Sequence, residues 1–281
     1  MRVLHLSDVH VDVPFAAMPA GGWAYPKRWL GGANLALRRK RRFRDAAEKL
    51  RILADFRREM DVDLVVCTGD YTALGTEAEL RAARLAIAPL TDAPLGFATI
   101  GGNHDVYVPD AVGRFERIFA DLLDPGPWPK VRIVDDTVAI VALDSTRPNP
   151  QPWRSSGRIP DPQLAALPKV LEGLGDRFVF VITHYAPRLA DGRPDRFTHG
   201  LTNADALLTA CAELKGAILH GHVHRRYRVR VPGVVPELFC AGSTTEAGHE
   251  GFWLYEVEGG TLRATPGGYR DGRYVLLETR S

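Results

Sequence analysis

The sequence has few cysteines, no long apolar run and almost no excess of charge of either sign. Its three cysteines, Cys67, Cys211 and Cys240, are too few and too scattered for a disulfide framework, which favours a reducing compartment. No apolar stretch approaches the ~20 residues that are needed to cross a bilayer. The strand-like residues 2–6 leave no room for a signal peptide. We therefore expect a cytoplasmic protein without a transmembrane segment.

The overall composition is that of an ordinary globular protein. The formal net charge of +2 at pH 7 is too small to indicate a nucleic-acid partner. With 281 residues, 45% of them hydrophobic and 25% charged, the chain can form one α/β core, and its length does not require a second domain. We therefore predict a single domain over residues 1–281, with a loop or insertion at about 11–36 and a mainly β part from about 225.

Five short apolar runs each precede polar residues of metal-binding type. The runs cover residues 3–6, 64–67, 97–100, 178–182 and 217–219, and their length and β-branched composition predict buried strands. The polar residues that follow them are Asp8 and His10, Asp70, Asn103 with His104 and Asp105, His184, and His222 with His224. Ligands bind outside the carboxyl ends of strands in open α/β sheets. We therefore expect these side chains to line one rim of a sheet.

Helical periodicity separates these strands. We predict helices over residues 38–60, 77–89, 110–123, 164–174 and 204–214, a hairpin within 131–143 that turns at Asp135–Asp136, and a loop at 145–160. From Tyr227 onward, short apolar runs alternate with glycines, which predicts antiparallel strands. The mixture of βα units and late antiparallel strands predicts two sheets packed face to face, with helices outside.

The polar residues form a donor set for metal ions. Asp8, His10, Asp70, Asn103, His184, His222 and His224 supply carboxylate, imidazole and amide donors without a thiolate, a set that suits Mn, Fe or Zn. Seven donors exceed what one ion needs while it keeps an open position. Two ions that share a carboxylate account for the number better, and Asp70 is the natural bridge, with one oxygen on each ion. Such a site lowers the pKa of a bound water from ~15.7 toward ~7 and clamps the oxygens of an in-line displacement at phosphorus.

His104 has no obvious place among these donors. We expect it to protonate the leaving oxygen, or to stabilise the charge that develops at phosphorus. Asp105 would then orient His104 as a hydrogen-bond acceptor. These two residues are the candidate catalytic pair.

Together these motifs resemble the calcineurin-like metallophosphoesterase superfamily. The resemblance spans residues 8–224 and consists of Asp8-Val9-His10, Gly69-Asp70, Gly102-Asn103-His104-Asp105, His184 and Gly221-His222-Val223-His224, in that order. It implies an α/β fold, a four-layer αββα sandwich of two mixed sheets flanked by helices, with a dinuclear metal site at the strand ends. It would place Asp8, His10, Asp70 and His224 on one ion, and Asp70, Asn103, His184 and His222 on the other, with His104 as the acid.

Two departures narrow the resemblance. Protein Ser/Thr phosphatases have Glu where this chain has Asp105, and purple acid phosphatases have a metal-binding Tyr where this chain has Ala73. Tyr71 directly follows Asp70 and should point away from the metal. What remains is similar to the bacterial cyclic-nucleotide and glycerophosphodiester phosphodiesterases. We therefore predict a phosphodiesterase that attacks a small-molecule phosphate ester with metal-bound hydroxide.

Three other functions stay open at this point. A phosphomonoesterase would use the same centre, and a nuclease would add the basic run Arg38–Arg44 as a contact for nucleic acid, although such a run is more often a solvated helix face. A non-catalytic, protein-binding scaffold is the third, and the complete donor set argues against it. Trp23, Tyr25 and Trp29 would either stack on a base or fasten their loop to the body.

The remaining histidines are mostly expected to be structural. His5 alternates into a strand interior, which predicts a hydrogen-bonded core histidine, and His220 falls on the face opposite the metals. His249 lies in a glycine-flanked loop. His199, in the polar stretch 191–203, would either contact substrate or remain a solvated loop residue.

Overall fold

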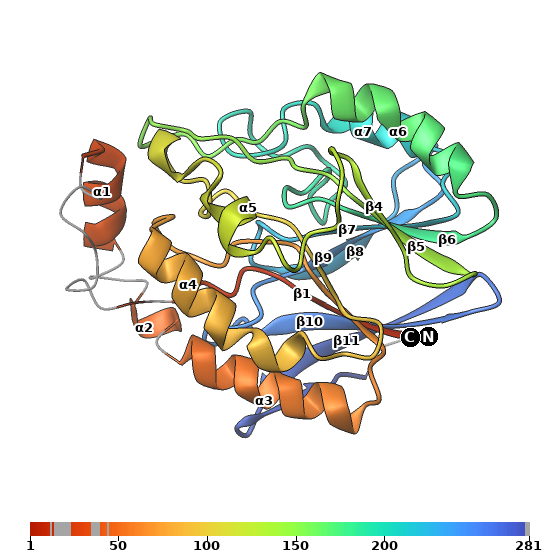
Figure 1. Ribbon diagram of the computed structural model, residues 1–281, viewed down its shortest axis with the longest axis horizontal. Helices are drawn as coiled ribbons and strands as arrows, with labels where there is room; N and C mark the ends of the chain where they lie inside the picture. The colour runs from red at the N-terminus through yellow and green to blue at the C-terminus, as the bar shows by residue number, and fades with distance from the viewer. Residues whose placement is uncertain (12, 14–23, 35–39, 44, 279–281) are drawn as a thin grey trace.

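Two six-stranded mixed sheets pack face to face, with helices on both outer sides (Figure 1). The computed structural model describes residues 1–281 except 12, 14–23, 35–39, 44 and 279–281. Trp23 and the arginines 38, 39 and 44 of the basic run therefore lie outside the described residues. Within the described part of the chain, no helix has the length and apolar character that a membrane span requires.

The first sheet has the strand order β12-β11-β10-β1-β2-β3. Its strands are β1 (Arg2–Leu6), β2 (Leu64–Cys67), β3 (Phe97–Thr99), β10 (Gly251–Glu258), β11 (Thr261–Arg270) and β12 (Arg273–Leu276). β1, β2 and β3 run parallel, whereas β10 pairs antiparallel with β1. The carboxyl ends of the first three strands therefore meet at one edge.

The second sheet has the order β4-β5-β6-β7-β9-β8. Its strands are β4 (Lys130–Ile133), β5 (Val138–Ala142), β6 (Phe178–Ile182), β7 (Gly216–His220), β8 (Arg226–Val229) and β9 (Glu237–Ala241). β5, β6, β7 and β9 are parallel neighbours, and β4 pairs antiparallel with β5 as the predicted hairpin. β6 and β7, which precede His184 and His222, thus end side by side.

The helices form the two outer layers. α3 (Ala46–Glu59), α4 (Glu77–Ala86) and α5 (Arg114–Ile118) lie on the side of the first sheet, whereas α6 (Asp161–Gly173) and α7 (Ala204–Ala210) lie on the side of the second (Figure 1). Short 3-10 turns cover Ala88–Leu90 and Pro109–Ala111. α1 (Pro26–Asn34) and α2 (Lys40–Phe43) lie at the end of the sandwich toward which β1 runs (Figure 1).

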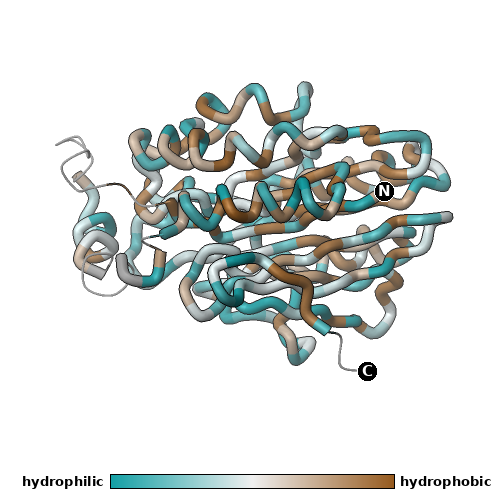
Figure 2. The backbone as a smooth tube through the Cα atoms, turned by 90° about the horizontal axis from the view of Figure 1, so that it is seen from below, coloured by the Kyte–Doolittle hydropathy of each residue, from teal (hydrophilic) through white to brown (hydrophobic). Residues whose placement is uncertain are grey.

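Three hydrophobic cores hold the four layers together. Alternation along β1 shows how they arise, because Leu4 and Leu6 pack under α3 while Val3 packs between the sheets. The third core joins β6 to α6 and α7, for example through Val181 and Leu207. Apolar residues accordingly follow the strands, and hydrophilic residues recur on the outer helices (Figure 2). The predicted four-layer sandwich is confirmed.

Three expectations about these elements were wrong in detail. The donor motifs follow strands of two facing sheets, not one, because β1, β2 and β3 belong to the first sheet and β6 and β7 to the second. The helix expected over 38–60 is divided into α2 and α3, and Asp45 is the N-cap of the latter. The helix expected over 110–123 is reduced to α5, because Gly113 adopts the left-handed conformation, with φ +74°, before it begins.

α1 is fastened to the body by two buried cations. Arg28 donates to both carboxylate oxygens of Asp110, each across 2.7 Å. Lys27 donates to the carbonyl oxygen of Asn149 across 2.7 Å, which ties α1 to the 145–160 loop. Tyr25 packs against a small apolar cluster, whereas Trp29 is 60% exposed. Tyr25 therefore fastens its segment to the body.

Candidate metal centre

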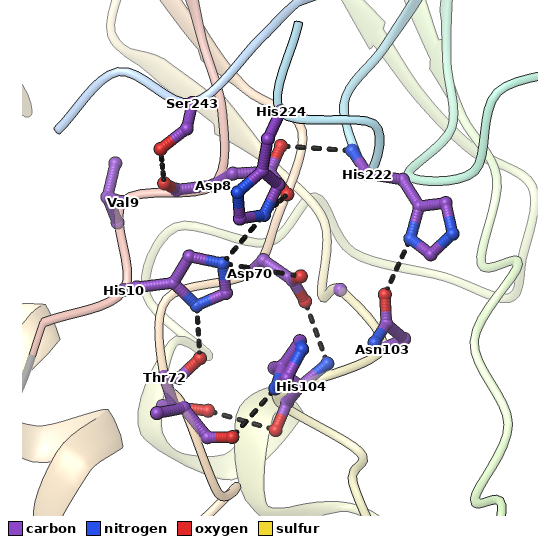
Figure 3. Close-up of polar contacts among 12 residues, drawn as sticks. Asp8, Val9, His10, Asp70, Thr72, Asn103, His104, His222, His224 and Ser243 are labelled. Atoms are coloured by element: carbon purple, nitrogen blue, oxygen red, sulfur yellow. Dashed lines mark hydrogen bonds and ion pairs between the residues drawn. The ribbon is translucent and has the colours of Figure 1, made fainter. Parts of the chain in front are cut away.

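The five strand ends bring all seven expected donors together at one end of the sandwich. Asp8, His10, Asp70, Asn103, His184 and His222 are at most 7% exposed, and His224 is partly buried. In Figure 3, Asp70 lies in the middle, with Asp8, His10 and His224 on one side of it and Asn103 and His222 on the other. Burial of so many polar donors is costly unless they share a partner.

The backbone at these positions is strained. Among the described residues, seven that are not glycine have a positive φ, and five of them are expected donors: Asp8, His10, Asp70, His222 and His224. A left-handed conformation is uncommon for such residues, costs energy and concentrates at functional sites. The fold therefore maintains strain at the positions that aim these side chains inward.

The first group of donors converges on one point. Atoms of Asp8, His10, Asp70 and His224 all lie within 4.8 Å of one another. Nε2 of His10 is 3.1 Å from Nε2 of His224, and that atom is 3.3 Å from Oδ1 of Asp8. The Asp8 Oδ1 atom is buried and has no hydrogen-bond partner.

The protons of the two imidazoles sit on the far side of each ring. Nδ1 of His10 donates to the carbonyl oxygen of Thr72 across 2.7 Å, and Nδ1 of His224 donates to Oε2 of Glu246 across 2.7 Å. In the neutral rings both Nε2 atoms therefore carry lone pairs, and they face each other and a carboxylate oxygen. Such an arrangement is repulsive without a cation, so this group fits a divalent metal ion.

The second group surrounds the amide oxygen of Asn103. Oδ1 of Asn103 lies 2.9 Å from Nε2 of His184 and 2.8 Å from Nδ1 of His222. The other nitrogens of these rings donate elsewhere, to the carbonyl oxygens of Thr68 and His199, across 2.8 Å and 3.1 Å. Again the atoms that face one another are acceptors, an arrangement that a cation would satisfy.

Asp70 lies between the two groups. Its Oδ2 atom is 3.8 Å from Nε2 of His10 and 3.5 Å from Nε2 of His184. Gly102 packs so closely that a Cβ atom on it would collide with this carboxylate, and a Cβ on Gly221 would collide with Asp8. The two glycines therefore permit the close approach of main chain to the acidic donors.

Burial keeps the imidazoles of His184 and His222 neutral. Burial lowers the pKa of His184, and burial together with the neighbouring imidazoles lowers the pKa of His222 well below its usual value. A histidine binds a metal in its neutral form. These two rings are therefore ready to bind an ion at neutral pH without first losing a proton.

His104 is held beside the donors by the main chain. Its Nδ1 atom donates to the carbonyl oxygen of Ala73 across 2.7 Å, and Tyr107 stacks on the ring. The carboxylate of Asp105 instead accepts from the main-chain nitrogens of Gly102, Tyr71 and Thr72. The orienting acceptor that we expected in Asp105 is thus the Ala73 carbonyl, and Asp105 acts on the loops that carry Asp70 and His104.

A cleft of about 680 Å³ opens over these residues. Asp70, Asn103, His104, His222 and His224 line its floor, and its walls come from Trp153, Ser155, Leu189, Val223 and residues 195, 196, 198 and 199. His199 lies against His222, with ring centroids 4.2 Å apart. We expected His199 either to contact substrate or to be a solvated loop residue. Because it lines the cleft, its position fits the first alternative.

Other expectations about single residues are confirmed. His5 is fully buried and bonds to Tyr255 and Thr68. Tyr71 points away from the donors and bonds to the hydroxyl of Thr99 across 2.6 Å. His249 contacts Arg225.

Sequence reasoning missed Glu246, which contacts His224. It follows β9 in the run Ser243-Thr244-Thr245-Glu246. A polar run directly after a strand was the signal that identified the donors, and the same signal was available here.

Comparisons with known proteins agree with this geometry. The family model of calcineurin-like phosphoesterases matches residues 1–226. The chain is 29% identical over 175 residues to the 3',5'-cyclic adenosine monophosphate phosphodiesterase CpdA of Pseudomonas aeruginosa. That match covers 61% of this chain and 57% of the relative's length.

Solved structures share the fold. A dimetal phosphatase from Danio rerio superposes with a TM-score of 0.65 at 15% identity, over 98% of both chains. The purple acid phosphatase PPD1 of yellow lupin gives a TM-score of 0.62 at 13% identity, over 98% of this chain and 52% of its own. The family match covers most of its length, so the chain belongs to the calcineurin-like phosphoesterases, and its group of donors fits a metal ion.

Proposed function

We propose that the protein is a phosphodiesterase that hydrolyses a small phosphate diester over a pair of metal ions. The observation that carries this proposal is the position of Asp70 Oδ2, which faces both His10 and His184 at the floor of the cleft. A single oxygen between two groups of acceptors is suited to two cations that lie close together.

The donors divide between the two ions according to their contacts. Asp8, His10, Asp70 and His224 would hold one ion, and Asp70, Asn103, His184 and His222 would hold the other. The two ions, of Mn, Fe or Zn, would activate a water molecule and neutralise the charge that builds on the phosphoryl oxygens. Asp70 would bridge them through Oδ2, because its Oδ1 accepts from the main-chain nitrogen of His104 across 2.7 Å. This differs from the bridge with one oxygen on each ion that the sequence suggested.

His104 would supply the proton for the leaving group. Its Nδ1 proton is committed to Ala73, so the ring presents Nε2 on its other side, and the residue lines the cleft. A proton held at Nε2 can pass to the departing oxygen as the bond to phosphorus breaks. The same ring, when charged, stabilises the negative charge of the transition state.

The diester is favoured over the monoester by two observations. The cleft is large enough to take groups on both sides of a phosphate, and the sequence relative is named a cyclic AMP phosphodiesterase. Trp153, which is 76% exposed, stands on the cleft wall where an aromatic substituent of the ester would pack.

The basic run Arg38–Arg44 supports a nuclease less than the cleft supports a small-molecule diesterase. Its Arg42 forms an ion pair across 2.9 Å with Glu246, beside the metal centre. Binding of nucleic acid by a nuclease, and with it the rate of hydrolysis, would also fall steeply as salt is added. We expect hydrolysis of a small diester to change far less between low and moderate salt.

Hydrolysis of two chromogenic esters tests the proposal. Metal-free protein reloaded with Mn²⁺ should cleave bis-p-nitrophenyl phosphate with a kcat/KM at least ~10-fold above that for p-nitrophenyl phosphate, a difference of about 1.4 kcal/mol. Chelation should abolish both activities. A preference for the monoester would show that the protein is a phosphomonoesterase rather than a phosphodiesterase. Inactivity of protein with two bound ions would favour a non-catalytic, protein-binding scaffold.

We also propose a cytoplasmic location. Cys67, Cys211 and Cys240 are free and buried, and pairing any of them into a disulfide would require a change in the core. A reducing compartment keeps such thiols in this state.

A further inference from the structure

Glu246 lies directly behind His224, on the side away from the cleft. Its Oε2 atom accepts from Nδ1 of His224 across 2.7 Å, and its side chain is 4% exposed. Its other oxygen, Oε1, accepts from Nη1 of Arg42 in α2 across 2.9 Å. Both carboxylate oxygens therefore have a defined partner.

The chemistry of this contact differs from that of the corresponding contacts of His10 and His184. Nδ1 of His10 and of His184 each face a neutral main-chain carbonyl, whereas Nδ1 of His224 faces a carboxylate. A carboxylate holds the proton on Nδ1 more firmly and increases the basicity of Nε2, the atom that faces Asp8 and His10.

His224 is also the ring that most needs such a partner. Its side chain is 23% exposed, compared with 1% for His10 and 0% for His184. The surrounding protein alone therefore restrains it less than it restrains the buried rings. A strong hydrogen bond from behind offsets this freedom.

The segment that carries Glu246 is fixed to the first metal motif. Ser243 Oγ donates to the carbonyl oxygen of Asp8 across 2.6 Å and accepts from the main-chain nitrogen of Glu246 across 3.2 Å. Thr245 Oγ1 donates to the carbonyl oxygen of Val9 across 2.6 Å. The carboxylate of Glu246 thus has a fixed position relative to Asp8 (Figure 3 shows Ser243 and Asp8).

α2 closes the same region from outside. The main-chain nitrogen of Ala247 donates to the carbonyl oxygen of Arg42 across 2.8 Å. The next residue, Phe43, packs its ring 4.8 Å from His10 and 6.0 Å from His224, measured between ring centroids. Arg42 therefore contacts Glu246, and Phe43 contacts His10 and His224, the ring that Glu246 holds.

We propose that Glu246 is a positioning residue for the first metal position: it holds His224 in the Nδ1-protonated form with Nε2 aimed at Asp8 and His10, and Arg42 fixes the carboxylate. The inference rests on the metal centre of the proposed function. It predicts that the affinity for metal, and not only the activity, depends on a residue that touches neither ion nor substrate.

Two substitutions and a matched control test it by Mn²⁺ titration of metal-free protein. Glu246→Ala removes the acceptor and should weaken the binding of one of two ions by ~10- to 100-fold. Glu246→Gln keeps an acceptor oxygen and should lose less affinity for Mn²⁺ than Glu246→Ala. Glu250→Gln is the control, because Glu250 lies in the same loop and pairs with Lys49 across 2.5 Å. It should bind metal as the wild type does.

A second readout requires no metal. In metal-free protein, the nitrogen chemical shifts of His224 should report the Nδ1-protonated tautomer in the wild type and Glu246→Gln, and a mixture in Glu246→Ala. Wild-type affinity and tautomer in Glu246→Ala, or an equal loss of affinity in Glu250→Gln, would overturn the inference. If the wild type binds no metal, the proposed function fails, while the tautomer measurement still decides the role of Glu246.

Discussion

The main-chain nitrogen of His104 donates a hydrogen bond to Oδ1 of Asp70 across 2.7 Å. This contact occupies one oxygen of the carboxylate and leaves Oδ2 facing His10 and His184. His104, the proposed acid, is therefore hydrogen-bonded to Asp70, the proposed bridge. This hydrogen bond restrains the distance between the main chain of His104 and the carboxylate of Asp70.

Replacing the bridge should remove metal and activity together. In Asp70→Asn the amide oxygen can still accept from His104, but the NH₂ group then faces His10 and His184 and cannot bind a cation. We expect metal content to fall from two ions to one or none and kcat/KM to fall roughly 1,000-fold, since the ions supply several kcal/mol. Metal analysis and hydrolysis of bis-p-nitrophenyl phosphate measure the two effects.

Asp144→Asn provides the comparison for that variant. Oδ1 of Asp144 accepts from the main chain and hydroxyl of Thr146, across 2.9 Å and 2.6 Å, so the substitution alters a capped turn. It should retain both ions. An Asp70→Asn protein with two ions and full activity would exclude the bridging role.

Replacing the acid should lower turnover and leave metal in place. His104→Ala removes a proton donor worth ~100- to 10,000-fold in rate. The loss should be smaller for bis-p-nitrophenyl phosphate, because p-nitrophenolate leaves without a proton, than for a diester with an alkoxide leaving group. Rates for both esters, with metal analysis, check this. An equal loss for both leaving groups would assign His104 to charge stabilisation.

The layers and the seven donors could be predicted from the sequence because both follow from local patterns. A buried strand is visible as a short apolar run, and a donor such as His184 or Asp70 is visible as the polar residue that ends it. When strands are parallel neighbours in one sheet, their ends must meet. The donors after β1, β2 and β3 therefore converge, as do those after β6 and β7, whereas the meeting of the two sets depends on how the two sheets face each other.

The contacts behind the donors could not be predicted, because they depend on where loops cross in space. Ala73 holds His104 and Glu246 holds His224. The polar run after β9 could have drawn attention to Glu246, but spacing along the chain does not reveal which ring either residue contacts. Similarly, the apolar pattern of 110–123 does not reveal that Gly113 takes a left-handed conformation. Asp105 illustrates the same limit, because its carboxylate accepts from the main-chain nitrogens of Tyr71 and Thr72, which follow a different strand.

The stability of the metal-free protein should fall in mild acid because of His5. Burial, followed by the charge of His220, lowers the pKa of His5 to about 3. Below pH 6.5, the usual pKa of a histidine, His5 takes up a proton in the unfolded chain but stays neutral in the folded chain. The free energy of unfolding should therefore fall by about 1.4 kcal/mol per pH unit from this residue, from pH 6.5 down to pH 3.

Chemical denaturation at pH 7, 6 and 5 measures this slope. In His5→Gln the contribution of His5 is absent, so stability should depend less on pH by about the same 1.4 kcal/mol per unit. Burial also lowers the pKa of His220 to about 4, so part of the slope remains in the variant. Equal slopes for the two proteins would show that His5 does not titrate as described.

Trp153 should determine affinity for aromatic esters without affecting folding. It is 76% exposed on the cleft wall, so it has little burial to lose in the free protein, whereas an aromatic substituent stacked on it would gain about 1 kcal/mol. Trp153→Ala should raise KM for bis-p-nitrophenyl phosphate about fivefold, leave kcat unchanged and leave KM for a small alkyl diester nearly constant. Leu85→Ala is the matched control, because Leu85 is also 76% exposed but lies on α4, outside the lining of the cleft. Both variants should unfold at the wild-type temperature, and an equal rise in KM for the aromatic and the alkyl ester would show that Trp153 does not recognise the aromatic group.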